Sequence, residues 1–248
     1  MTPSTIDELG IEGHLMSVNI RNLDISINGN SIVHDVQLTI ADGERVGLIG
    51  SSGSGKSMIA KAMMGILPSM AQVSGDIDLD GTHVVGATDE VMATLRGRSV
   101  GMVFQNPSVA LNPVMTVAQQ VGLPLYLHYD LTLEERAERV KTMLSKVGLA
   151  EDALLKYPHE LSGGQQQRVG IATALITSPR LIIADEPTTA LDSITQRQIV
   201  DLLTSLVDDS GASMLFITHD FRCCVAPPPD ATCYPKACRG IRRDFHAA

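Results

Sequence analysis

The sequence predicts an α/β fold with an antiparallel β region near its start and a helical insert in its middle. Three observations support this prediction. Apolar runs of strand length recur at Arg45–Ile49, Ser99–Phe104 and Leu181–Ala184, a glycine-rich loop follows the first run, and helical periodicity dominates about 106–179. Strands that alternate with helical patterns in this way are typical of a parallel sheet covered by helices.

Composition limits the class of protein. At 248 residues the chain suits one domain with subdomains, and its formal net charge of −9 argues against general binding to nucleic acid or anionic membranes. The N-terminus carries acidic residues where a signal peptide would be basic and then apolar, and no apolar run reaches the roughly 18 residues of a membrane span. We therefore expect a cytosolic protein without nucleic-acid partners.

The loop that follows Arg45–Ile49 matches the pattern G-x-x-x-x-G-K-[ST]. Its residues are Gly50, Ser51, Ser52, Gly53, Ser54, Gly55, Lys56 and Ser57. Glycines allow consecutive backbone N–H groups to turn toward phosphate oxygens, and the N-terminus of the next helix adds positive potential. Lys56 would reach the β- and γ-phosphates, and the Ser57 hydroxyl would bind Mg²⁺. The alternative is a Gly/Ser-rich surface loop that carries a lysine by chance.

The other elements of the first half follow in order along the chain. Alternating apolar residues within 17–40, interrupted by a turn at 28–30, predict antiparallel strands, and Met58–Leu67 has helical spacing. Residues 73–85 predict strand and turn, and Ser99–Phe104 predicts a buried strand that ends at Gln105. Gln105 should therefore lie at the carboxyl edge of the sheet, where ligands bind in open α/β folds.

Two helices are the clearest elements of the insert. Leu131–Gly148 has apolar residues at every third or fourth position, the capping-box pair Thr132 and Glu135, and a glycine at its end. Leu161–Arg168 opens a second helix with a glycine-rich, polar start, which a merely structural helix would not require. This start is a candidate binding segment.

Two carboxylates, Asp185 and Glu186, directly follow the apolar run Leu181–Ala184. A buried parallel strand would place both acids at its exposed end, which suits a Mg²⁺ site. The alternative is that these acids cap the next helix, but the phosphate-binding loop upstream favours the metal site.

Two further polar residues adjoin predicted elements. Asp192 is expected to cap the next helix, and His219 directly follows the apolar strand 213–218. A single histidine is usually a structural residue. The position of His219 at the carboxyl end of another strand favours a role in the site.

Taken together, these residues resemble the nucleotide-binding subunit of ATP-binding cassette (ABC) transporters over about 17–220. The matching motifs are Gly50–Ser57 for the Walker A loop, Gln105 for the Q-loop glutamine, Leu161–Gln165 for the LSGGQ signature, Leu181–Glu186 for Walker B, Ala190–Asp192 for the D-loop and His219 for the switch histidine. The resemblance implies the ABC ATPase fold, a P-loop NTPase core with an antiparallel β subdomain and a helical insert. It also implies ATP and Mg²⁺ as cofactors.

The resemblance implies a role for each residue of the site. Ser57, Gln105 and Asp185 would form the metal site, with Asp185 acting through water. Glu186 would orient or deprotonate the attacking water, and His219 would hold the γ-phosphate.

The resemblance also implies a head-to-tail dimer. One subunit would contact the γ-phosphate bound at Lys56 of the other, so neither would hydrolyse ATP alone at full rate. The residues of this contact would be Ser162, Gly163, Gly164 and Gln165, with Asp192 of the D-loop also at the nucleotide.

Three longer segments, Phe104–Pro113, Tyr157–Gly164 and Ala184–Asp192, resemble the dipeptide, oligopeptide and nickel importer branch of the family. They imply the ATP-hydrolysing subunit of a bacterial importer for peptides, with nickel import as the closest alternative. The implied partners are a second ATP-binding subunit, identical or different, two transmembrane permease subunits and a periplasmic solute-binding protein. The implied location is the cytoplasmic face of the bacterial inner membrane. A soluble cassette ATPase of DNA repair or translation usually has a long coiled coil or a second cassette, and this sequence predicts neither.

Two segments depart from the family pattern. The family commonly stacks adenine on an aromatic residue, but Ile27–Ser31 offers none, so aliphatic contacts are expected in its place. The second segment, 221–248, contains all four cysteines, at 223, 224, 233 and 238, and three consecutive prolines. The polar segment 1–16 is expected to be a loosely held N-terminal tail.

The cysteines of 221–248 allow two interpretations. A zinc site is disfavoured because the spacing lacks the paired C-x-x-C that such sites use. The hypothesis we favour is a reading-frame change just after Asp220, which predicts a disordered C-terminal segment and leaves open a defective product. Resequencing the gene tests this hypothesis, because a single-base correction should restore a family-like continuation.

Overall fold

The computed structural model describes residues 17–189 and 191–219. The expectations for 1–16, for Ala190 and for 220–248 with its four cysteines lie outside the described residues. Within the described ranges, no helix is both long and apolar enough to cross a membrane. The domain boundaries given above stay predictions.

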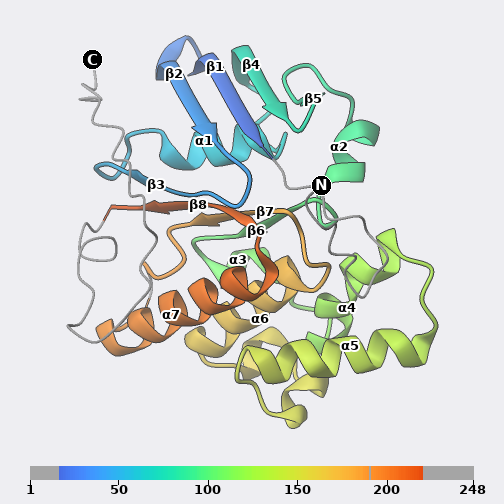
Figure 1. Cartoon of the computed structure of the whole chain (residues 1–248). Coiled ribbons are helices and arrows are strands. Elements are labelled where there is room, and N and C mark those ends of the chain that lie inside the picture. Colours follow the sequence, from blue (N-terminus) through green and yellow to red (C-terminus); the bar gives the residue numbers. More distant parts are fainter. Residues whose placement is uncertain (1–16, 190, 220–248) are drawn as a thin grey trace.

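An antiparallel sheet forms one layer of the structure (Figure 1). Its strands, in the spatial order β2-β1-β4-β5, are β1 (Val18–Ile27), β2 (Asn30–Ile40), β4 (Ala71–Leu79) and β5 (Thr82–His83). Asn28 and Gly29 join β1 to β2 with φ angles of 51° and 80°. Two consecutive positive φ angles are what a tight two-residue hairpin turn requires, so the expected turn is confirmed.

A parallel sheet forms the second layer and separates two hydrophobic cores. Its strands, in the spatial order β3-β8-β7-β6, are β3 (Arg45–Ile49), β6 (Val100–Val103), β7 (Leu181–Asp185) and β8 (Ser213–Thr218). Successive side chains of a strand point to opposite faces. Leu181 and Ile183 accordingly lie in the core shared with the antiparallel sheet, whereas Ile182 and Ala184 lie in the core shared with the helices. Strand β7 is thus buried on both faces, as its apolar run predicts.

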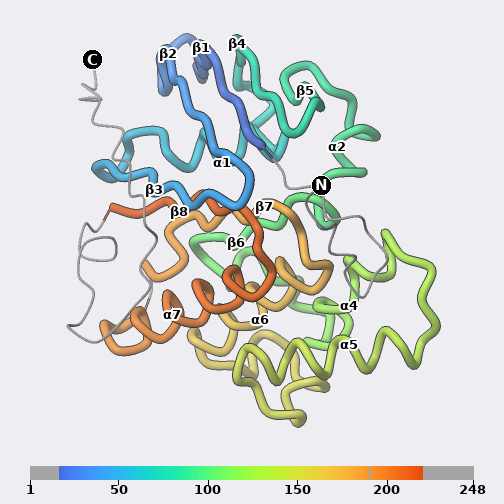
Figure 2. Tube along the Cα trace, in the orientation of Figure 1, coloured from blue at the N-terminus to red at the C-terminus, as the bar shows by residue number. Residues whose placement is uncertain are grey.

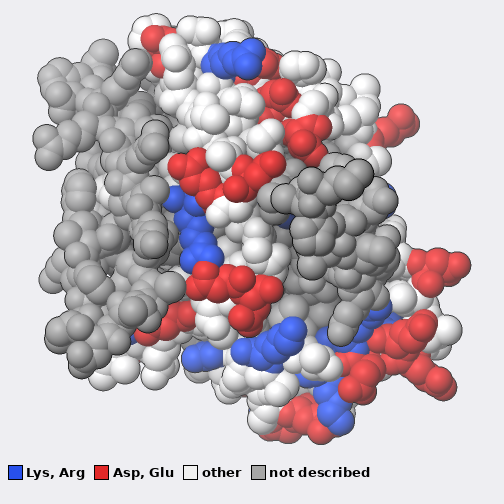
Figure 3. Space-filling model, viewed as in Figure 1, with Lys and Arg blue, Asp and Glu red and all other residues white. Residues whose placement is uncertain are grey.

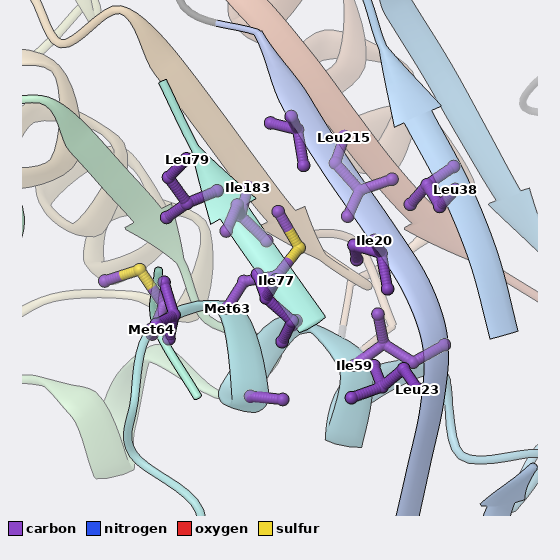
Figure 4. Packing of buried hydrophobic residues seen from close by; sticks show 14 of the residues in the cluster. Ile20, Leu23, Leu38, Ile59, Met63, Met64, Ile77, Leu79, Ile183 and Leu215 are labelled. Carbon is purple, nitrogen blue, oxygen red and sulfur yellow. The ribbon is translucent and has the colours of Figure 1, made fainter. Parts of the chain in front are cut away.

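Helix α1 (Lys56–Met63) lies between the two sheets (Figure 1). Figure 4 shows its residues Ile59 and Met63 among side chains of both sheets, including Ile20 and Ile183. All four side chains are buried. This packing fixes the start of α1, and therefore the glycine-rich loop before it, against the parallel sheet.

The helix is shorter than the Met58–Leu67 segment that has helical spacing. It ends at Met63 because Gly65 adopts the left-handed conformation, with a φ of 61°. Ile66 is consequently 37% exposed instead of lying on the buried face. The helical spacing of apolar residues in the sequence therefore extends beyond the end of α1 at Met63.

The remaining helices come mostly from the middle of the chain. They are α2 (Asp89–Leu95), α3 (Pro107–Ala110), α4 (Val117–His128), α5 (Leu133–Lys146), the 3₁₀ turns η1 (Glu151–Leu155) and η2 (Pro158–Glu160), α6 (Gly163–Leu175) and α7 (Ser193–Ser210). Figure 2 follows the chain from the antiparallel sheet through these helices and back to α7 and β8. Helix α6 packs closely on β6, since a Cβ atom at Gly101 would lie 2.3 Å from the carbonyl oxygen of Ala174.

Helix α5 confirms the helix expected at Leu131–Gly148. The backbone N–H of Glu135 donates to Thr132 Oγ1 at 3.2 Å, and the N–H of Thr132 donates to Glu135 Oε2 at 2.8 Å. These two bonds form the expected capping box. At the other end Gly148 has a φ of 71°, so the glycine stops the helix as predicted.

Candidate functional site

Loops from all four parallel strands meet at one edge of the sheet. Because the strands are parallel, the residues that follow them lie along the same carboxyl edge. These residues are the glycine-rich loop after β3, His219 after β8, Glu186 after β7 and Gln105 shortly after β6. The fold therefore brings together groups that are far apart in the sequence.

The loop before α1 requires glycine at two positions. Gly53 and Gly55 have φ angles of 81° and 83°, in the left-handed region that favours glycine. A Cβ atom at Gly55 would lie 2.8 Å from the carbonyl oxygen of Ile32 and 2.8 Å from a methyl group of Val33. The loop can follow β2 this closely only without a side chain. Gly55 is also the N-cap of α1 and makes no side-chain cap, so the first N–H groups of the helix are available to an anion.

The Lys56 side chain folds back onto this loop. Its ammonium group donates to the carbonyl oxygens of Gly50 and Ser51 at 2.9 and 2.8 Å, and to Ser54 Oγ at 3.4 Å. It also lies 3.7 Å from Glu186 Oε1, and Lys56 is only 4% exposed. A phosphate that enters the loop would therefore meet a cation that is already largely removed from water.

Ser57 and Asp185 form a buried pair. The Ser57 hydroxyl donates to Asp185 Oδ1 at 2.8 Å, and Asp185 is 4% exposed. Burial raises the pKa of the Asp185 carboxyl above its ordinary value, and the hydrogen bond from Ser57 opposes that rise. Both side chains offer oxygen atoms, which are the ligands that Mg²⁺ prefers.

The Glu186 carboxylate connects the four loops. Its Oε2 accepts hydrogen bonds from Gln105 Nε2 at 3.1 Å and from Thr189 Oγ1 at 2.9 Å. The same oxygen lies 3.1 Å from His219 Nδ1. In the tautomer with a proton on Nδ1, His219 donates to this oxygen and completes the set.

The backbone of Glu186 is also unusual. Its φ angle of 44° lies in the left-handed region, which is uncommon for a residue other than glycine. The N–H of Glu186 donates to the carbonyl oxygen of Ile217 at 3.0 Å, and the residue is 7% exposed. The bond to neighbouring strand β8 thus holds the Glu186 backbone in a conformation of the kind that clusters at functional sites.

Ser162 and Gln165 cap helix α6 reciprocally. The N–H of Gln165 donates to Ser162 Oγ at 3.3 Å, and the N–H of Ser162 donates to Gln165 Oε1 at 2.9 Å. Because the Ser162 hydroxyl oxygen accepts in this pair, its own proton can be donated to another group. Gly163 and Gly164 add no side chains to this turn, so an external anion could approach its N–H groups.

The segment Ser162–Gln165 packs beside the start of α7. A Cβ atom at Gly164 would lie 3.2 Å from Thr195 Cγ2. Asp192 caps α7 as expected, accepting from the N–H groups of Ile194 and Thr195, both at 3.1 Å. A third hydrogen bond, from the Thr195 hydroxyl at 2.7 Å, is the main reason that the pKa of Asp192 lies below its ordinary value.

The predicted site residues thus fall into two groups. The first group surrounds the glycine-rich loop and contains Lys56, Ser57, Gln105, Asp185, Glu186 and His219. The second group contains Ser162, Gly163, Gly164, Gln165 and Asp192. Among the residues that the structure describes, no hydrogen bond or ion pair joins the second group to the loop Gly50–Ser57.

Sequence reasoning missed Thr189. The signal that could have revealed it is local, because Thr189 follows Glu186 by three positions across Pro187, the spacing of a tight turn. The N–H of Thr189 donates to the carbonyl oxygen of Glu186 at 3.3 Å, which closes that turn and brings the hydroxyl to the carboxylate.

Figure 3 shows charge on the face of the molecule seen in Figure 1. Basic and acidic side chains of the described residues are interspersed there, and acidic groups flank the basic ones. The phosphate-binding features described above are therefore a local arrangement rather than part of a broad basic surface on this face.

The family model for the ABC transporter matches residues 33–189. The chain therefore belongs to the ABC transporter family. Two solved structures agree in fold. The ATP-binding cassette MJ0796, dimeric and bound to ADP and Pi, is 34% identical with a TM-score of 0.74, over 83% of this chain and 89% of that one. CbiO1 of Clostridium perfringens is 31% identical with a TM-score of 0.70, over 84% and 80% of the two chains. They confirm the expected ABC ATPase fold.

Among curated relatives, the oligopeptide transport ATP-binding protein OppD of Lactococcus lactis subsp. cremoris is 44% identical over 191 residues, 76% of this chain and 56% of the relative. A putative peptide import ATP-binding protein of Brucella ovis is 44% identical over 197 residues, with coverages of 76% and 58%. The chain thus spans just over half the length of these relatives. They confirm the resemblance to the peptide importer branch.

Proposed function

We propose that this chain binds and hydrolyses ATP, with Mg²⁺ as cofactor, as the nucleotide-binding subunit of a bacterial importer of peptides. The observation that carries the proposal is the convergence of Lys56, Asp185, Glu186 and His219 around a phosphate-binding loop. Each of these groups suits one requirement of phosphoryl transfer, which depends on positioning and charge neutralisation more than on covalent chemistry.

The phosphates would be held by the backbone N–H groups of the loop and by Lys56. The Lys56 ammonium would exchange its bonds to the carbonyl oxygens of Gly50 and Ser51 for bonds to phosphate oxygens. Glu186 would orient the attacking water and accept its proton, since its carboxylate is buried and 3.7 Å from Lys56 Nζ. His219, with its side chain 43% exposed, can turn from Glu186 toward the γ-phosphate.

Mg²⁺ fits the pair Ser57 and Asp185. In the described part of the chain, no group of three or more His, Cys, Asp or Glu side chains could form a metal cage. Mg²⁺ does not need one, because it usually combines one or two protein oxygens with water and substrate phosphates. Ser57 would bind the ion directly, Asp185 through water, and Gln105 would lie within reach of it. When bound, the ion neutralises charge on the phosphate oxygens.

The second group of residues suggests a composite site between two subunits. Ser162–Gln165 is an open helix start suited to an anion, yet within the described ranges it has no bonded contact with the loop of its own chain. A head-to-tail dimer would place this start over the nucleotide of the other subunit. The dimeric state of the similar cassette MJ0796 with ADP and Pi supports this arrangement.

The importer role rests on the relatives named for oligopeptide transport and peptide import. The proposed partners are a second ATP-binding subunit, two transmembrane permease subunits and a periplasmic solute-binding protein. In this assembly the chain would lie at the cytoplasmic face of the inner membrane. The chain would convert closure of the ATP-binding subunits around ATP into movement of the permease subunits.

Uptake in a strain without this gene tests the role in import. We expect loss of oligopeptide uptake and normal uptake of free amino acids, measured with labelled substrates. The wild-type gene should restore peptide uptake, and the Glu186→Gln gene should not, because import requires hydrolysis. Loss of nickel uptake alone would instead assign the chain to nickel import. Unchanged uptake of both substrates would contradict the importer role.

Mixing two inactive variants tests the composite site. Gly163→Asp retains the phosphate-binding loop and Lys56→Ala retains the helix start Ser162–Gln165, so a mixed dimer contains one intact site. Each variant alone should be at least about 100-fold slower than wild type, by analogy with loss of one transition-state donor. Partial ATPase activity should return on mixing, measured as phosphate release at concentrations where sedimentation shows dimers.

The control for this mixture pairs Lys56→Ala with a subunit that carries both substitutions. That pair contains no intact loop and should stay inactive. If dimers form and the Gly163→Asp and Lys56→Ala mixture is equally inactive, then Ser162–Gln165 does not act across the interface.

A further inference from the structure

The two oxygens of the Glu186 carboxylate have different surroundings. Oε2 receives the bonds from Gln105 and Thr189 and lies beside His219, at 2.9 to 3.1 Å. Oε1 has one polar neighbour among the described residues, Lys56 Nζ at 3.7 Å, which is too long for a hydrogen bond. One oxygen is held by three neighbours, and the other faces the phosphate-binding loop.

The three neighbours of Oε2 differ in how they are attached. Gln105 and His219 follow strands β6 and β8, are exposed, and lie at the same carboxyl edge as the phosphate-binding loop. Thr189 belongs to the same turn as Glu186. Its N–H and its hydroxyl both lie 3.3 Å from the Glu186 carbonyl oxygen, and the hydroxyl lies 2.9 Å from Oε2.

This difference matters when the site fills. Gln105 and His219 would leave Oε2 in order to contact the metal ion and the γ-phosphate. Thr189 can remain, because it moves with Glu186 and the turn is anchored by the bond from the Glu186 N–H to Ile217. A single hydroxyl would then hold the carboxylate against rotation.

We propose that Thr189 is a positioning residue: its hydroxyl holds Oε2 of Glu186 so that Oε1 receives the proton of the attacking water. This inference rests on the ATP hydrolysis of the proposed function. In that step the water oxygen forms a bond to the γ-phosphorus, and the bond from this phosphorus to the β–γ bridging oxygen breaks, which gives ADP and phosphate. The water proton moves to Oε1 of Glu186.

Two substitutions at Thr189 separate its hydroxyl from its methyl group. Thr189→Val keeps the shape and removes the donor, whereas Thr189→Ser keeps the donor. We expect Thr189→Val to lower kcat by about tenfold, the effect of losing one hydrogen bond to a charged group. The KM for ATP should change less than twofold, and Thr189→Ser should retain most of the wild-type kcat. The matched control, Thr94→Val in α2, loses a hydroxyl bonded to Val91 O and should leave kcat unchanged.

A double-mutant cycle with Glu186→Gln distinguishes positioning from a merely structural effect. If Thr189 acts through the Glu186 carboxylate, Thr189→Val should not slow the residual turnover of Glu186→Gln any further. If Thr189→Val lowers kcat by the same factor in the wild-type protein and in Glu186→Gln, the proposal is overturned. A Thr189→Val enzyme with wild-type kcat, or failure of Thr189→Ser to restore activity, would overturn it as well.

Crystal structures of the wild-type and Thr189→Val proteins with Mg²⁺ and a non-hydrolysable ATP analogue provide a reading that does not depend on activity. The Glu186 carboxylate should occupy a different position in Thr189→Val than in the wild-type protein, because Gln105 and His219 no longer hold Oε2 there. An unmoved carboxylate would overturn the positioning role even if the protein hydrolyses ATP. Conversely, a wild-type protein that does not hydrolyse ATP would refute the proposed function, whereas the crystal structures would still decide whether Thr189 holds Oε2.

Discussion

Replacing Glu186 with glutamine should reduce ATP turnover by about 10²- to 10⁴-fold, the usual contribution of a general base. The amide has nearly the same shape and can still accept the hydrogen bond from Thr189. It cannot accept a proton from water. Affinity for MgATP should not weaken, since the substitution removes a negative charge that lies close to the phosphate-binding loop. Phosphate release and equilibrium nucleotide binding measure the two quantities on the same protein.

Two controls accompany this prediction. Glu134→Gln makes the same change at an exposed residue in the first turn of α5 and should leave turnover within about twofold of wild type, as is usual for surface substitutions. Removal of Mg²⁺ with EDTA should stop wild-type turnover, because Ser57 and Asp185 would then lack the ion that joins them to the phosphates. Wild-type turnover in Glu186→Gln would show that another group is the base.

Local parts of this fold could be predicted because their signals are short in sequence. The glycines of the loop, the apolar run of β7 and the capping box of α5 each specify a conformation within about ten residues. The end of α1 was predicted less well. Helical spacing extends to Leu67, but Gly65 turns the chain two residues after Met63, so the position of a left-handed glycine overrode periodicity.

The assembly of the site depends on contacts that the local sequence does not encode. Ser57 meets Asp185 across 128 positions, and Gln105 meets Glu186 across 81, because β6 pairs with β7, and β8 lies between β7 and the β3 strand that leads to Ser57. Motif resemblance predicted that such residues belong together. It did not predict that Lys56 bonds to the carbonyl oxygens of its own loop, or that one oxygen of Glu186 gathers most of the hydrogen bonds.

The pair Lys56 and Glu186 has consequences for the protein without nucleotide. Both groups are almost fully buried, 4% and 7% exposed, and the Lys56 ammonium lies 3.7 Å from Glu186 Oε1. Removing one member of a buried pair leaves a desolvated charge behind, which is more costly than the pair is favourable. Substitution at either position should therefore be judged by stability as well as by activity, and a folded variant is required before an effect on nucleotide binding is interpreted.

Lys56→Ala should nearly abolish nucleotide binding. The ammonium group is the one buried cation described within the loop, so its loss should cost about 2–5 kcal/mol of binding free energy, as is usual for truncating one member of a buried charge pair. This corresponds to an affinity for MgATP about 30-fold to several thousand-fold weaker.

The matched control is Lys61→Ala, which removes the same charge from the last turn of the same helix and should change affinity only a few-fold. Calorimetric titration measures both variants, and circular dichroism verifies that each is folded. If folded Lys56→Ala binds MgATP as tightly as Lys61→Ala does, the loop Gly50–Ser57 is not where this chain holds the phosphates. The roles proposed for Ser57 and Glu186 would then fail with it, since both depend on a γ-phosphate at that position.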